Sequence, residues 1–109
     1  MQISEIAREC GFTIINRGED IEARSVYCCD LLSIVMSNAP EGCIWFTVMG
    51  NVNSVAVSVL SDIACIVLAH GSSLDEDAMQ KAQEQNVWIL QTALPIFDAA
   101  DTVNRLINA

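Results

Sequence analysis

The sequence predicts an α/β fold, a single three-layer domain in which a mainly parallel sheet is flanked by helices. From residue 43 onward, apolar runs alternate with segments of helical periodicity in the order strand, helix, strand, helix, strand, helix. Short connections join these segments, so the crossovers should be right-handed and neighbouring strands parallel. A chain of 109 residues is close to the commonest domain size, and we expect residues 1–109 to build one core.

The strands are predicted from runs of apolar and β-branched residues. Two of these runs, 43–49 and 64–69, contain almost no other residue type, which is typical of central strands covered on both faces. Three shorter runs complete the predicted set, at residues 12–16, 26–29 and 87–90. Segment 17–25 is polar and has no clear period, so it is predicted to be a loop.

The helices are predicted from apolar residues spaced three and four positions apart. They span residues 2–10, 31–38, 53–62, 75–85 and 95–107. Segment 53–62 also contains valines that alternate as in a strand, but its apolar residues match the helical spacing better. Either Asn51 or Asn53 can cap this helix, and Asn86 is placed to close the next one.

The balance of charge limits the partners. Fourteen acidic and five basic residues give the chain a formal charge of -9. Such a charge repels a phosphate backbone and an anionic membrane surface, so nucleic acid and membrane partners are not expected. A small anionic ligand, bound by one arginine and by backbone amides, is still compatible with the sequence. The chain is 52% hydrophobic and only 17% charged, and we therefore expect a homodimer or larger homo-oligomer that covers part of its surface.

The amino-terminal residues lack the basic segment and the long apolar run of a secretory signal. No apolar run reaches the length of about 20 residues that spans a bilayer. We expect a cytoplasmic protein. Its five cysteines are an odd number without metal-finger spacing, which favours reduced thiols. Adjacent Cys28 and Cys29 would point to opposite sides of a strand, so we expect buried thiols rather than a metal site.

A candidate binding site follows from the predicted sheet, because ligands of open parallel sheets bind beyond the carboxyl ends of the strands. The polar residues at these positions are the candidate ligand-binding residues: Asp30, Thr47, Asn51, Asn53, His70 and Thr92. Asp30 joins the set only if the strand before it is parallel to its neighbour. The alternative interpretation of Asp30, which we favour, is the N-cap of the following helix.

No complete catalytic set is present in the sequence. His70 is the only histidine, so a zinc site would need cysteine or carboxylate partners elsewhere. Neither Ser33 nor Ser72 lies in a Gly-x-Ser-x-Gly elbow, and there is no Gly-x-x-x-x-Gly-Lys phosphate loop. We therefore expect a protein that is not an enzyme, with no metal and no cofactor. An enzyme that uses Asp30 and His70 as acid and base is the least favoured alternative.

Several segments together resemble stand-alone DRTGG-domain proteins, small domains similar to the amino-terminal domain of HPr kinase/phosphorylase. The segments are Cys29-Asp30-Leu31-Leu32-Ser33, Trp45-Phe46-Thr47-Val48, Asn53-Ser54-Val55-Ala56-Val57 and Ala64-Cys65-Ile66-Val67. The resemblance covers nearly the whole chain and implies an α/β domain that self-associates. The signature itself is degenerate, because the stretch in its place, residues 21–26, contains neither glycine.

The resemblance also implies regulation or assembly rather than turnover, since DRTGG domains occur beside CBS pairs. The leading hypothesis is a non-catalytic, homo-oligomeric regulatory or assembly domain that senses a nucleotide or phosphorylated metabolite at the carboxyl ends of the strands. Stand-alone copies are encoded near iron-only hydrogenases, which implies the alternative. In that alternative, the chain is an accessory subunit that docks on a redox enzyme such as a hydrogenase.

Overall fold

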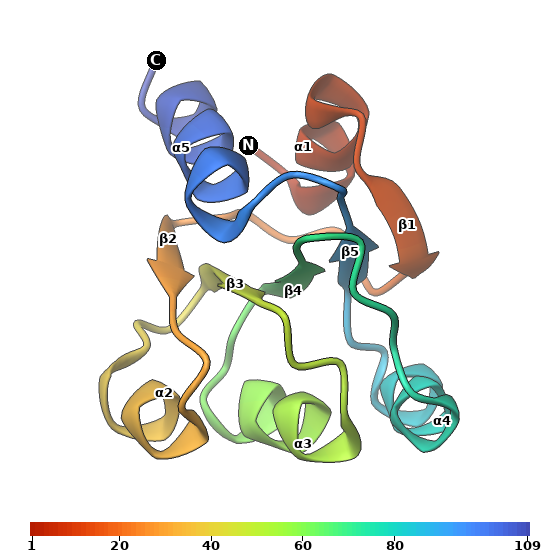
Figure 1. The fold of residues 1–109 in the computed structure, drawn as a ribbon. Helices are drawn as coiled ribbons and strands as arrows, with labels where there is room; N and C mark the ends of the chain where they lie inside the picture. Colours follow the sequence, from red (N-terminus) through yellow and green to blue (C-terminus); the bar gives the residue numbers. More distant parts are fainter.

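The computed structural model describes residues 1–109 and contains one five-stranded sheet between two layers of helices (Figure 1). The strands are β1 (Thr13–Asn16), β2 (Ser25–Cys28), β3 (Cys43–Thr47), β4 (Cys65–Leu68) and β5 (Ile89–Gln91). The helices are α1 (Ile3–Cys10), α2 (Leu32–Asn38), α3 (Val52–Leu60), α4 (Glu76–Gln85) and α5 (Ile96–Ile107). The predicted α/β class is confirmed, and none of the five helices has the length and apolar character needed to cross a membrane.

The strand order is β1-β5-β4-β3-β2, and every adjacent pair from β2 to β5 is parallel. Each crossover from β2 onward leads to the adjacent strand of the sheet, always on the same side, so β3, β4 and β5 follow β2 in order. Because such crossovers are right-handed, their helices α2, α3 and α4 all lie on one face of the sheet (Figure 1). Helices α1 and α5 cover the other face (Figure 1). Strand β1 is antiparallel to β5, so the sheet is mainly parallel, as predicted.

The core has two halves, one on each face of the sheet. Along β3, the side chains of Ile44 and Phe46 pack in the half that contains α1 and α5, whereas Trp45 packs in the half that contains α2, α3 and α4. Strand β4 alternates in the same way, with Val67 on the first side and Ile66 on the second. This two-sided burial explains the almost unbroken apolar sequence of the central strands.

Some predicted boundaries shift. Asn51, not Asn53, caps α3, because its side chain accepts a hydrogen bond of 3.0 Å from the backbone N–H of Ser54. The strand predicted at 87–90 begins only at Ile89. Val87 lies in the turn that follows α4, where its N–H donates to the carbonyl of Ala82. Asn86 closes α4 in a left-handed conformation with φ of 53°, as the sequence indicated.

Candidate carboxyl-edge site

The parallel strands β2 to β5 all end at the same side of the sheet, which we call the carboxyl edge. The six candidate residues follow these strand ends. Asp30 comes after β2, Thr47 ends β3, Asn51 and Asn53 stand at the start of α3, His70 comes after β4, and Thr92 comes after β5. The condition for including Asp30 is therefore met, because β2 is parallel to β3.

Asp30 is not an N-cap, so that prediction is wrong. The N-cap of α2 is Leu31, which has no side-chain cap. Asp30 lies one residue too early to reach the free N–H groups of the first turn. Its Oδ1 instead accepts hydrogen bonds from the hydroxyl of Thr47 at 2.6 Å and from the N–H of Val48 at 3.1 Å. The carboxylate thus ties the loop after β2 to the end of β3.

Thr47 connects the loop that follows β2 to the loop that follows β4. Its side chain is fully buried, and its Oγ1 also accepts a hydrogen bond of 3.2 Å from the N–H of Met49. Its carbonyl accepts a hydrogen bond of 3.0 Å from the N–H of Ala69, the residue before His70. A continuous series of hydrogen bonds therefore runs from Asp30 through Thr47 to the end of β4.

His70 and Thr92 belong to neighbouring turns that are joined by their backbones. The N–H of His70 donates to the carbonyl of Leu94, and the N–H of Gly71 donates to the carbonyl of Thr92, both at 2.8 Å. His70 is in the left-handed region with φ of 55°, and its exposed imidazole makes no hydrogen bond. The Oγ1 of Thr92 accepts a hydrogen bond of 3.2 Å from Leu94 N–H. His70 is therefore the free side chain of this pair.

Two residues outside the set of candidate ligand-binding residues, Gly50 and Gln91, also help to build the edge. Gly50 packs so closely against the loop after β4 that a Cβ atom would lie 2.2 Å from the carbonyl oxygen of Ser73. The carbonyl of Gly50 also accepts a hydrogen bond of 2.7 Å from Asp75 N–H. Gln91 donates from Nε2 to the carbonyl of Ser72 at 2.8 Å. Only the glycine gave a signal, since a glycine directly after a strand indicates a close backbone approach.

The electrostatics of the carboxyl edge come from the backbone and from the acidic residues Asp30, Asp75, Glu76 and Asp77. Helices α2, α3 and α4 begin there, so the positive ends of their dipoles face the edge. No lysine or arginine occurs in the loops 29–31, 48–51, 69–75 and 92–95. We expected that one arginine could help to bind a small anionic ligand, but no arginine lies in the loops of this edge. Backbone N–H groups, Asn53 and His70 are the donors available to a ligand.

The cysteines are all free, but the expectation that Cys28 and Cys29 are buried is wrong. Cys28 is exposed because it ends β2, the edge strand, and Cys29 is only half-buried. Partial desolvation of the Cys28 thiol by the surrounding atoms, and then the nearby charge of Asp30, raise its pKa. Burial raises the pKa of Cys43 to about 11. These thiols are poor nucleophiles at neutral pH.

The opposite side of the sheet, where β2 to β5 begin, is the amino edge. Loop 17–24 must run along it, because it connects β1 and β2, the two outermost strands. We call this loop the strap; it includes residues 21–24 of the stretch that the sequence resemblance compared with the DRTGG signature. Backbone pairing fixes the strap to the start of the chain: Ile3 N–H donates to Ile21 at 3.1 Å, and Ala23 N–H donates to Met1 at 2.9 Å.

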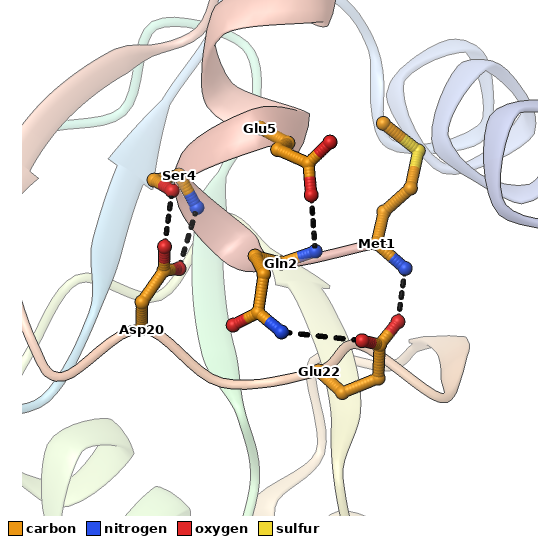
Figure 2. Close-up of polar contacts among 6 residues, drawn as sticks. All are labelled: Met1, Gln2, Ser4, Glu5, Asp20 and Glu22. Carbon is orange, nitrogen blue, oxygen red and sulfur yellow. Dashed lines mark hydrogen bonds and ion pairs between the residues drawn. The ribbon is translucent and has the colours of Figure 1, made fainter.

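Side chains reinforce this attachment, and Figure 2 shows them. The carboxylate of Asp20 accepts hydrogen bonds from the N–H of Ser4, at 3.1 Å, and from its hydroxyl, so it caps α1 from outside the helix. Glu22 pairs with the amino group of Met1 and accepts a hydrogen bond of 3.2 Å from Gln2 Nε2. The bonds from the Ser4 hydroxyl and N–H lower the pKa of Asp20. The segment that was predicted to be a loop is therefore held by hydrogen bonds to the first four residues of the chain.

Comparison with known proteins supports the fold. No protein-family model matches the chain, and no curated protein matches its sequence. A solved structure does match: the CBS and DRTGG domains of the regulatory region of Clostridium perfringens pyrophosphatase, complexed with its activator, diadenosine tetraphosphate. The TM-score is 0.72 at 13% identity, over 91% of this chain and 44% of that one. The chain thus has a DRTGG/CBS-like fold and spans less than half of the matched chain.

The Asp30 contact gives a first prediction. Replacing Asp30 with Ala removes the acceptor of a buried hydroxyl and of one N–H, so the free energy of unfolding should fall by about 1–3 kcal/mol in urea titrations. Thr47→Val removes the other partner, and the double variant should lose less than the sum of the single losses. Strictly additive losses would mean that the Asp30–Thr47 hydrogen bond contributes nothing.

The Asp20 contact gives a pH-dependent prediction. Because the folded pKa of Asp20 lies below its unfolded value, its stabilisation is present above the unfolded pKa of about 3.9 and is lost as the pH falls through the folded pKa. The melting temperature of Asp20→Asn should therefore lie below that of the wild type at pH 6, and the two should converge in strong acid. Glu84→Gln, which removes an exposed carboxylate without a hydrogen-bond partner, is the control. A constant difference across this pH range would contradict the assignment.

Proposed function

We propose that residues 1–109 form a single DRTGG-like domain that regulates rather than catalyses, and that it senses a nucleotide or phosphorylated metabolite at the carboxyl edge. The likeness of its fold to a regulatory region supports the first part. The observation that carries the second is the hydrogen-bond series from Asp30 through Thr47 to the turn at His70. A ligand that contacts either end of this series would shift the loops that begin α2 and α4.

The chemistry of the edge favours an anion held by backbone groups. Three helix N-termini converge there, and helix N-termini bind phosphate through free N–H groups. The exposed imidazole of His70 is the one titratable side chain there that gains positive charge on protonation. Asp30 already uses one carboxylate oxygen internally, which leaves the other for a ligand hydroxyl.

The pKa values of the thiols and the hydrogen bonds of Asp30 agree with a role without catalysis. The thiols whose pKa is raised are not prepared for nucleophilic attack. Asp30 is engaged by a hydroxyl and an N–H rather than by an imidazole. Five free cysteines are also in keeping with our proposal of a cytoplasmic protein.

Self-association is the third part of the proposal. Four exposed apolar side chains lie in the loops or first turns that follow strands β2, β3 and β5: Leu31, Val48, Leu94 and Phe97. The Phe97 side chain is the most accessible of these, with 73% exposed. Exposed apolar patches of this kind mark interaction sites. We propose that a second copy covers them, so that the ligand site lies beside the subunit interface.

Ligand sensing is tested by thermal shift with diadenosine tetraphosphate, ATP and AMP. A ligand at 100 times its dissociation constant should add about 2.7 kcal/mol to the free energy of unfolding. His70→Asn keeps a residue that tolerates the left-handed backbone, so the fold should persist while the shift becomes smaller. Gln85→Ala, at the amino edge, should leave the shift unchanged. No shift with any of the three compounds would contradict nucleotide sensing.

Self-association is tested by sedimentation equilibrium at micromolar concentration. The wild type should have twice the protomer mass of 11.8 kDa, and Phe97→Ser should shift it toward the monomer because it removes apolar surface from the interface. Leu60→Ser is the matched control, since Leu60 is equally exposed but lies at the far end of α3. A monomeric wild type, or equal effects of both variants, would overturn this part of the proposal.

A further inference from the structure

The hollowed surface of the molecule is the amino edge, not the carboxyl edge. Two cavities of about 410 and 340 Å³ lie there. Both are lined by Ile21 of the strap and by the residues that lead from α3 into β4, Asp62, Ile63 and Ala64. The shared residues make the two cavities one continuous depression, which we call the amino-edge groove.

The groove has two walls and a floor. The strap forms one wall, through Glu19, Ile21 and Glu22. The carboxyl-terminal ends of α3 and α4 form the other wall, because crossover helices run opposite to the strands. The floor is made by the residues that enter β4 and β5, among them Ala64 and Trp88. Both walls are fixed, the strap by its attachment to α1 and the helix ends by their packing.

The charges of the lining are unbalanced. The acidic residues are Glu19, Glu22, Glu41 and Asp62, the basic residue is Arg24, and the amino group of Met1 pairs with Glu22, so four negative charges against two positive leave a net charge of -2. The carboxyl-terminal ends of α3 and α4 add the negative ends of two helix dipoles. At the carboxyl edge the acids Asp30, Asp75, Glu76 and Asp77 lie where α2 and α4 begin, so the positive ends of the helix dipoles oppose their charge instead of adding to it.

The arrangement of these acids selects the kind of cation. No three histidine, cysteine or acidic side chains lie close enough together to hold a metal ion. Apolar side chains separate the acids instead, and Ile21 and Val59 are each 41% exposed in the groove. Such a surface matches a ligand that combines positive charge with an aliphatic chain.

Trp88 fixes the position of the strap at one end of the groove. The indole Nε1 donates to the carbonyl of Glu19 at 2.6 Å, which fixes the strap above the start of β5. The guanidinium of Arg17 lies over the indole, 5.1 Å from the ring centroid. Because Trp88 itself is only 2% exposed, a ligand would meet the Glu19 carboxylate and the aliphatic residues rather than the aromatic face.

We infer that the amino-edge groove binds a small organic cation, an aliphatic amine or guanidinium compound of the polyamine class. The carboxylates of Asp62 and Glu19 contact its charged groups, and Ile21, Val59 and Ile63 contact its methylene chain. A volume of about 410 Å³ is within the range of small-molecule sites. This site is independent of the one proposed at the carboxyl edge, since the two lie at opposite edges of the sheet.

The experiment is isothermal titration of the full chain with spermidine and with agmatine. Saturable binding is expected for at least one of them, with no saturable binding of Mg²⁺ or of uncharged 1,6-hexanediol. Asp62→Asn and Glu19→Gln should each weaken the affinity about tenfold, the value of one charge-assisted contact. Asparagine tolerates the left-handed backbone of residue 62, where φ is 52°.

A control variant distinguishes binding at the groove from the general attraction of a cation to an acidic protein. Glu76→Gln removes one negative charge at the carboxyl edge, at the start of α4, and should leave the affinity unchanged. The inference is overturned if neither amine binds saturably, if Mg²⁺ binds as well as the amines, or if Glu76→Gln weakens binding as much as Asp62→Asn. Circular dichroism of each variant shows whether it is folded.

Discussion

The structure depends on the one-directional series of crossovers from β2 to β5. Because each crossover is right-handed and each leads to the adjacent strand, α2, α3 and α4 must lie on the same face. The other face then has to be covered by helices outside the crossovers, and α1 and α5, from the two ends of the chain, cover it (Figure 1). Strands β3 and β4, buried on both sides, can contain almost only apolar residues.

The same topology places opposite ends of the helix dipoles at the two edges. Three helices begin at the carboxyl edge and end at the amino edge, so their dipoles favour anions at one side and cations at the other. Side chains strengthen this difference at the amino edge, where Glu19 and Asp62 add formal charge. At the carboxyl edge the side chains of Asp30 and Thr47 are hydrogen-bonded to each other, whereas those of Asn53 and His70 are available to a ligand.

The strap shows how a loop without periodicity can still have one conformation. It has to cross the width of the sheet because β1 and β2 are the outermost strands. Pairing with the first residues of the chain and the capping of α1 by Asp20 satisfy its backbone and side-chain groups (Figure 2). The strap includes residues 21–24 of the stretch that the sequence resemblance compared with the DRTGG signature, and its residues Glu19, Ile21 and Glu22 line the amino-edge groove.

The sequence by itself determined the fold class, the approximate helices and strands, and the set of residues at the carboxyl edge, since periodicity and strand alternation are local properties of the chain. Only the tertiary structure decided what those residues do. Asp30 looks like an N-cap in sequence, yet it accepts hydrogen bonds from Thr47 and Val48, seventeen and eighteen residues away. The groove could not be predicted from the sequence either, because the strap and Asp62 line the same cavity only when β1 and β2 form opposite edges of one sheet.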